Sequence, residues 1–96
     1  MKGGNVNEFI DRTTYEECAV IYKGIKYFFH GIMFDKAKGE YTYVIDVWDN
    51  DGNYERTVFS QTTASVEKCL ELAQNEPIFE GKTFWEAESD MEWVDW

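Results

Sequence analysis

Residues 18–60 read CAVIYKGIKYFFHGIMFDKAKGEYTYVIDVWDNDGNYERTVFS, and aromatic and β-branched side chains recur densely along this stretch. They gather in four segments, CAVIY (18–22), IKYFFHGIMF (25–34), EYTYVIDVW (40–48) and YERTVFS (54–60). Such residues favour strands, and the short glycine-containing connections between the segments favour hairpin turns. The stretch therefore predicts a four-stranded antiparallel meander.

The turns also predict how the strands pair. A two-residue Lys-Gly turn sets Tyr22 opposite Ile25, and the Asp-Gly turn farther along sets Ile45 opposite Val58. With this pairing, both faces of the sheet carry large apolar side chains. We therefore expect elements outside the meander to cover parts of both faces.

One covering element is an amphipathic helix from about Ala64 to Asn75. Its apolar residues follow the spacing of one helix face, Val66, Cys69, Leu70 and Ala73. Thr63 or Ser65 supplies the cap, and Pro77 stops the helix. The fold class is therefore α+β, with one main helix packed on the sheet.

The other covering element is the C-terminal segment 77–96, which is aromatic and acidic. Thr83 and Glu86 have the spacing of a capping box that opens a short helix. Residues 76–96 hold seven acidic side chains against Lys82, whereas the remaining 75 residues hold twelve acidic and eight basic ones. Two interpretations fit this segment. Its tryptophans cover the sheet face while the carboxylates stay in water, or they serve as anchors for docking onto a basic protein. The predicted partner-binding residues are Trp85, Glu86, Glu88, Asp90, Glu92, Trp93, Asp95 and Trp96.

The N-terminal part is more ambiguous. Residues 1–5 are expected to form a disordered tail. Residues 14–23 fit either a helix opened by the Thr-x-x-Glu pattern at Thr14 or the strand 18–22, and we favour the strand because Val20, Ile21 and Tyr22 prefer it. The 96 residues are expected to form a single domain.

Composition narrows the function classes. The 19 acidic and 9 basic residues give a formal net charge of −10, which disfavours direct binding to nucleic acid or to an anionic membrane. The sequence shows neither a signal-peptide pattern nor a long apolar span, so a cytoplasmic location is expected. Cys18 and Cys69 are predicted to be buried free thiols.

Three motifs suggest chemistry, and each has a simpler interpretation. Asp49-Asn50-Asp51-Gly52 suits a turn better than an EF-hand, because Val47 and Val58 would occupy ligand positions. His30, the single histidine, is not accompanied by a recognisable nucleophile motif. Gly81-Lys82-Thr83 lacks the earlier glycine of a phosphate-binding loop. We expect no enzymatic activity, no metal and no cofactor.

Two phrases, IYKGIKYF at 21–28 and PIFEGKTFWE at 77–86, resemble segments of small acidic bacterial proteins, and this resemblance implies no particular activity.

Sequence alone does not determine the function. Our best interpretation is a small non-enzymatic accessory or regulatory module that binds a basic protein. The alternative is a nucleic-acid mimic that inhibits a nuclease or a DNA-binding protein, and a small hydrolase ranks below both. Self-association into a homodimer through the apolar sheet face is a further hypothesis.

Overall fold

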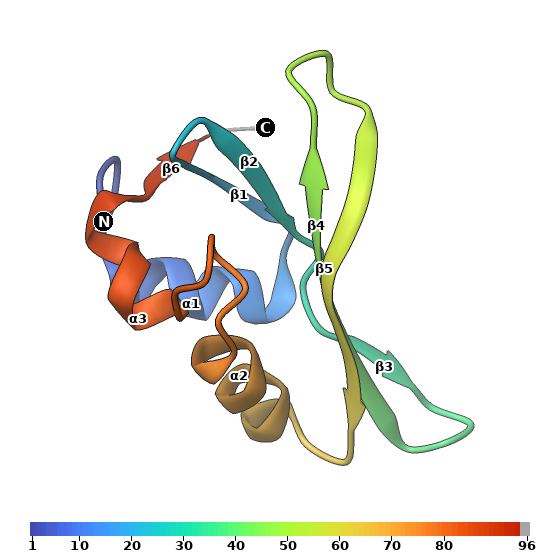
Figure 1. Ribbon diagram of the computed structural model, residues 1–96. Helices are drawn as coiled ribbons and strands as arrows, with labels where there is room; N and C mark the ends of the chain where they lie inside the picture. Colours follow the sequence, from blue (N-terminus) through green and yellow to red (C-terminus); the bar gives the residue numbers. More distant parts are fainter. Residues whose placement is uncertain (95–96) are drawn as a thin grey trace.

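The computed structural model describes residues 1–94, in which an antiparallel sheet carries three α-helices on one side (Figure 1). In chain order the elements are α1 (Val6–Tyr15), β1 (Cys18–Tyr22), β2 (Ile25–Phe29), β3 (Met33–Asp35), β4 (Glu40–Trp48), β5 (Tyr54–Thr63), α2 (Val66–Asn75), α3 (Phe84–Ala87), the 3-10 helix η1 (Glu88–Asp90) and β6 (Glu92–Val94). The predicted α+β class with an antiparallel sheet is confirmed. The sheet has six strands rather than the predicted four.

The long strand β4 organises the sheet. Along one edge it pairs first with β3 and then with β2, and along the other edge it pairs with β5. β2 also pairs with β1, and β1 pairs in turn with β6. The observed β1–β2 register, with Tyr22 opposite Ile25, is the predicted one.

The predicted single strand 25–34 is wrong, because the chain leaves the sheet at His30-Gly31-Ile32. Gly31 has φ +78°, and a Cβ on it would lie 3.1 Å from the carbonyl oxygen of Glu16. The backbone N–H of Ile32 then donates to the carbonyl of Thr14 at 3.0 Å. The close approach to the end of α1 therefore separates β2 from β3.

The predicted register of the β4–β5 hairpin holds at only two pairs, because the observed register shifts both at Trp48 and at Ile45. Near the turn, Asp46 faces Thr57 and Val47 faces Arg56, but Ile45 faces Phe59 rather than Val58. Val58 is an extra residue in β5, which makes a β-bulge. The bulge places Phe59 beside Ile45 in the core.

The N-terminal helix α1 begins at a cap that the sequence interpretation missed. Asn5 Oδ1 accepts hydrogen bonds from the backbone N–H groups of Asn7 and Glu8. Thr14 lies in the last turn of α1, where its hydroxyl donates to the carbonyl of Ile10, so it does not open a helix. The strand at 18–22 is confirmed.

Residues 1–5, for which the sequence predicts a disordered tail, contact β6 instead. The backbone N–H of Lys2 donates to the carbonyl of Met91, and the N–H of Trp93 donates to the carbonyl of Lys2, both at 2.8 Å. The C-terminal segment in turn supplies a strand at the edge of the sheet, where Trp93 faces Val20 of β1. The start and the end of the described chain therefore lie side by side.

The main helix agrees with its prediction, apart from its start. α2 begins at Val66 rather than Ala64, with Ser65 as its cap, and it ends at Asn75 before Pro77. Cys69 and Ala73 are buried, and Leu70 is half-buried. The predicted apolar stripe therefore faces the core.

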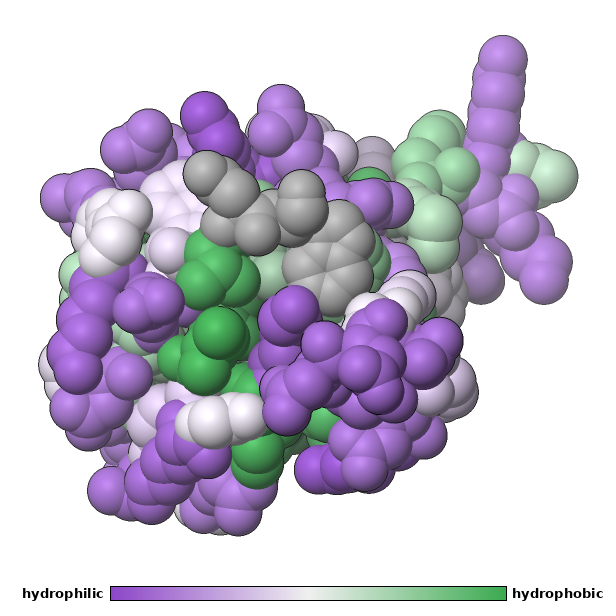
Figure 2. All heavy atoms as spheres, turned by 90° about the horizontal axis from the view of Figure 1, so that it is seen from above, coloured by the Kyte–Doolittle hydropathy of each residue, from purple (hydrophilic) through white to green (hydrophobic). Residues whose placement is uncertain are grey.

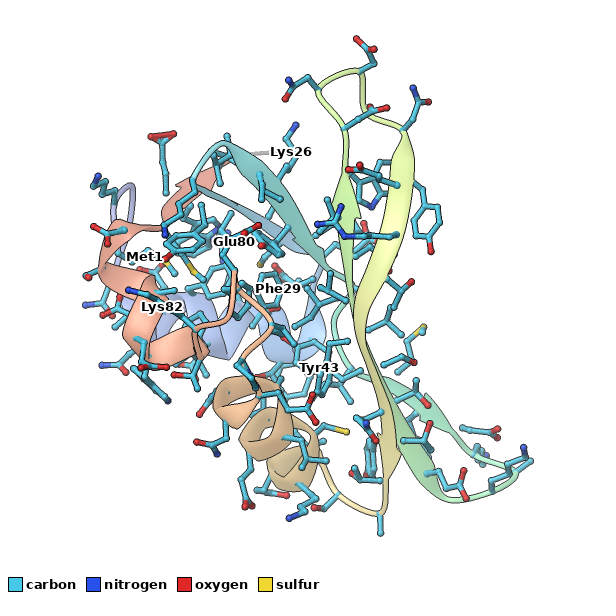
Figure 3. All side chains as sticks on the ribbon, viewed as in Figure 1. Met1, Lys26, Phe29, Tyr43, Glu80 and Lys82 are labelled. Atoms are coloured by element: carbon cyan, nitrogen blue, oxygen red, sulfur yellow. The ribbon has the colours of Figure 1, made fainter. Side chains whose placement is uncertain are left out.

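Aromatic rings from the sheet and from the helices fill the core. Phe9 of α1 meets Phe29 of β2 edge-on at 5.2 Å and stacks on Phe84 of α3 at 6.1 Å. Phe29 and Tyr43 extend from the sheet toward the helices (Figure 3). Cys18 and Cys69 are buried free thiols, as predicted. Burial also raises the pKa of the Cys18 thiol.

We predict that Phe9→Ala lowers the free energy of unfolding by about 3–5 kcal/mol, because the ring is fully buried and its removal leaves a cavity. Tyr15→Ala on the same helix is the control, since its side chain is 79% exposed, and it should change stability by less than about 0.5 kcal/mol. Urea unfolding followed by circular dichroism measures both. Equal losses would contradict the assignment of Phe9 to the core.

Candidate protein-binding surface

The short helix α3 is positioned by the predicted capping box, which is confirmed. The hydroxyl oxygen of Thr83 accepts from the N–H of Glu86, and the N–H of Thr83 donates to the carboxylate of Glu86 at 3.0 Å. The bond from the Thr83 N–H is the main reason that the pKa of Glu86 lies below its ordinary value. Glu86 therefore stays charged while it holds the start of α3.

The structure places the predicted aromatic anchors in different environments. Trp85 on α3 is 48% exposed, and its Nε1 donates to Oε1 of Gln74 at 3.3 Å. Trp93 is half-buried against the ring of Phe9 at 5.3 Å, with the Arg12 guanidinium 5.5 Å from its ring centre. Trp85 is thus accessible, whereas Trp93 belongs to the packing of α1 on β6. Trp96 lies outside the described residues.

The predicted acidic residues also differ in what they do. Glu86, Asp90 and Glu92 are exposed. Glu88 is half-buried and accepts a hydrogen bond from the α-amino group of Met1 at 3.0 Å. Asp95 lies outside the described residues. The exposed members therefore continue the negative surface of α3, whereas Glu88 holds the N-terminal residues.

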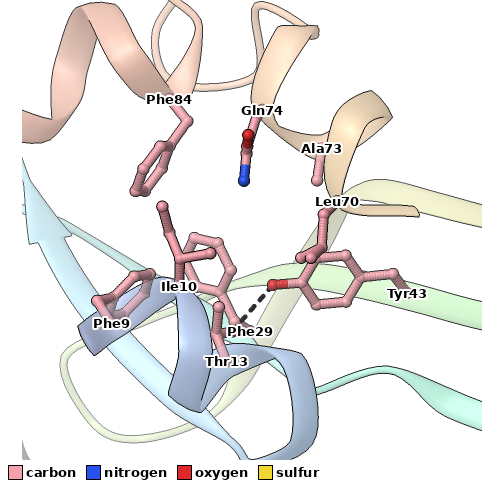
Figure 4. A pocket seen from close by; sticks show the side chains of 9 residues that line it. All are labelled: Phe9, Ile10, Thr13, Phe29, Tyr43, Leu70, Ala73, Gln74 and Phe84. Atoms are coloured by element: carbon pink, nitrogen blue, oxygen red, sulfur yellow. Dashed lines mark hydrogen bonds between the residues drawn. The ribbon is translucent and has the colours of Figure 1, made fainter. Parts of the chain in front are cut away.

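A shallow apolar pocket of about 20 Å³ lies between the helices and the sheet (Figure 4). The lining side chains come from α1, α2, α3, β2 and β4: Phe9, Ile10, Thr13, Phe29, Tyr43, Leu70, Ala73, Gln74 and Phe84. Gln74 joins the pocket to the exposed indole, because its amide oxygen accepts from Trp85. The volume corresponds to about one water molecule, so the pocket suits the tip of a side chain rather than a metabolite.

A buried hydrogen bond forms part of the pocket wall. The hydroxyl groups of Thr13 and Tyr43 lie 2.9 Å apart and connect α1 to β4. Burial strongly raises the pKa of Tyr43, although the bond to Thr13 opposes this effect. Tyr43 therefore remains protonated at neutral pH and provides a polar contact in an otherwise apolar wall.

The sequence analysis named Trp85 as a candidate binding residue but did not predict this pocket. The stripe on α2 indicated an apolar face for Leu70 and Ala73, but no local pattern showed that Ile10 or Thr13 would meet them. These residues line one pocket although they are about sixty positions apart. α1 and α2 cover the same side of the sheet, and the spacing of neighbouring residues does not encode that arrangement.

Charge is distributed unevenly between the two sides of the protein. The segments that hold the helices, 5–17 and 64–91, contain eleven acidic and three basic residues, a balance of −8. The remaining residues contain eight acidic and six basic ones, a balance of −2. We call the first group the helical layer.

Figure 2 shows the molecule from above the view of Figure 1. On this face, polar residues surround a small apolar group.

His30 lies outside the helical layer and forms a different cluster. Its Nε2 is 2.5 Å from Oδ2 of the buried Asp46, whose Oδ1 accepts from the hydroxyl of Thr57 at 2.7 Å. Within residues 1–94 His30 makes no side-chain hydrogen bond to a serine, threonine or cysteine. The cluster thus supplies a base and an orienting carboxylate but no positioned nucleophile.

The described residues contain no group of three or more potential metal-ligating side chains. Asp49 Oδ1 accepts from the backbone N–H groups of Asp51 and Asn53, which confirms the predicted turn.

The helices between residues 1 and 94 are too short or too polar to cross a bilayer.

We predict that Thr13→Val costs about 1–3 kcal/mol of unfolding free energy, because it leaves the buried Tyr43 hydroxyl without its partner. Adding Tyr43→Phe removes that unpaired hydroxyl, so the double variant should be less destabilised than the sum of the two single variants. Chemical denaturation of all four proteins gives the coupling energy. Strict additivity would show that the hydroxyl pair contributes nothing to stability.

Comparisons of this chain with protein-family models, with curated protein sequences and with solved structures found no match.

Proposed function

We propose that this protein is a small non-enzymatic module that binds a basic partner protein through its helical layer. The observation that carries the proposal is the balance of −8 in that layer, where nine of the eleven carboxylates are exposed. Opposite charge on a partner would steer it to this side and orient it during encounter.

Trp85 and the adjoining pocket supply apolar contacts, which charged side chains alone do not provide. Protein interfaces place an aromatic anchor and apolar contacts inside a polar rim. Trp85 is exposed and Gln74 connects it to the pocket, while Asp11, Glu71 and Glu86 lie on the three helices that meet there. The matching partner surface carries lysine or arginine around one small apolar side chain.

A non-enzymatic role is supported by the residues that line the hollows of the surface. The pocket beside Trp85 is far smaller than the roughly 300–1,000 Å³ of typical ligand sites. Two wider hollows, of about 230 and 360 Å³, are lined without histidine or cysteine. His30 is absent from the lining of all three.

Nucleic-acid mimicry is the narrower form of the same proposal. Its support is that the exposed carboxylates are spread over α1, α2 and α3 rather than gathered in one loop, so they resemble phosphates distributed along a strand. A mimic would occupy a nucleic-acid-binding channel, and its affinity would fall steeply with salt. An anchored interface would depend more on Trp85.

We predict that Trp85→Ala weakens capture of the basic partner by at least about tenfold, a loss of about 1.4 kcal/mol, since interface tryptophans often dominate binding. Phe34→Ala is the matched control, because Phe34 is 55% exposed on β3, away from the helical layer. The immobilised chain and both variants are incubated with cytosolic extract, and captured proteins are identified and titrated.

The same titration tests whether the charge of the helical layer contributes to binding. Glu71→Lys in α2 is the test variant, and Glu55→Lys in β5 is its control. Both carboxylates are exposed, and each lies 3.5 Å from a basic side chain. Weaker binding by Glu71→Lys alone supports the helical layer as the docking surface. A partner that binds both variants and Trp85→Ala like the wild type would refute it, and displacement of a bound oligonucleotide would identify mimicry.

A further inference from the structure

β5 has one open edge. This ten-residue strand pairs with β4, and among the described residues no other strand pairs with it. Backbone N–H and C=O groups on the open side of an edge strand are a template for pairing with another chain. Most of β5 is exposed, including Ser60, Gln61 and Thr62.

The sequence of this edge lacks the usual protection against pairing. Residues 57–63 read TVFSQTT, without a charge, a proline or a glycine. Native edge strands are commonly protected by lysine, proline or bulges. The bulge at Val58 disturbs the pairing near one end, but the residues from Phe59 to Thr63 continue in regular register with β4. Threonine, valine and phenylalanine also favour strand pairing.

Electrostatics indicates which chain fits this edge. Two copies of a chain with a net charge of −10 repel each other, and most of that charge lies in the helical layer. β5 contains one acidic and one basic residue, Glu55 and Arg56, which lie 3.5 Å apart. The edge is therefore a neutral contact surface on an acidic protein, so it attracts no charged partner and opposes a second copy least.

We propose that two copies of this chain pair antiparallel at the open edge of β5, centred on Ser60, and form one continuous sheet. A twofold axis at Ser60 sets Ser60 opposite itself and Phe59 opposite Gln61. This register keeps the two faces of the sheet matched, because Phe59 and Gln61 face Ile45 and Tyr43, two core residues of β4. The contact is isologous and closes at a dimer. It uses the edge of the sheet rather than its apolar face.

Sedimentation velocity from micromolar to millimolar concentration tests the proposal on the full chain. The wild type should shift from monomer to dimer, and added salt should strengthen the dimer by screening repulsion. Ser60→Lys sets two like charges opposite each other and should raise the dissociation constant at least about tenfold. Asn50→Lys, in the exposed β4–β5 turn, makes the same charge change away from the edge and should have little effect.

A disulfide provides a second readout. Ser60→Cys should form a cross-linked dimer under mild oxidation, because the native thiols of Cys18 and Cys69 are buried and directly opposite side chains are close. Asn50→Cys should cross-link far less. A wild type that stays monomeric at millimolar concentration overturns the proposal, as does equal dimerisation of Ser60→Lys and Asn50→Lys.

Discussion

The carboxylate of Asp46 is the constraint on which the sheet depends. Asp46 is 6% exposed, and a buried carboxylate is costly unless hydrogen bonds or an opposite charge compensate it. His30 supplies one partner from the end of β2, and Thr57 supplies the other from β5. A single side chain on β4 therefore connects β4 to its two neighbours β2 and β5.

That tie coincides with the two irregularities that shape the molecule. One of the two register shifts between β4 and β5 falls between the pairs Ile45–Phe59 and Asp46–Thr57, and β2 gives way to β3 just after His30. The bulge sends Phe59 to the helix side, and the break at Gly31 brings the chain against the end of α1. Phe59 packs edge-on against Tyr43 at 6.2 Å, and Phe29 packs edge-on against Phe9 at 5.2 Å. These rings belong to the core that the three helices share.

Local sequence patterns correctly predicted the features that depend on residues close together in the chain. The Lys-Gly turn predicted the β1–β2 register, the spacing of Cys69 and Ala73 predicted the buried face of α2, and Thr83 with Glu86 predicted the cap of α3. Each of these depends on residues a few positions apart. Propensity and spacing carry that information directly.

Where sequence reasoning failed, the cause lies far away along the chain. The uninterrupted strand 25–34 failed because Gly31 approaches Glu16, and β6 is a three-residue strand that exists by pairing with β1. For the candidate site, the sequence assigned Trp85 and Trp93 the same role, but Trp85 is exposed whereas Trp93 packs against Phe9 and Arg12. Alternating aromatic and acidic residues do not distinguish an anchor in solvent from a ring packed beneath a helix.

The same packing separates a negative surface from a neutral one. Helices α1 to α3 gather most of the negative charge on one side, whereas β5 stays neutral at the edge of the sheet. Salt should weaken an attraction between the helical layer and a basic partner, because it screens opposite charges. It should favour contact between two copies at β5, because it screens their mutual repulsion. A partner on the helical layer would itself cancel part of that repulsion, so the two proposed interactions are compatible and each would make the other easier.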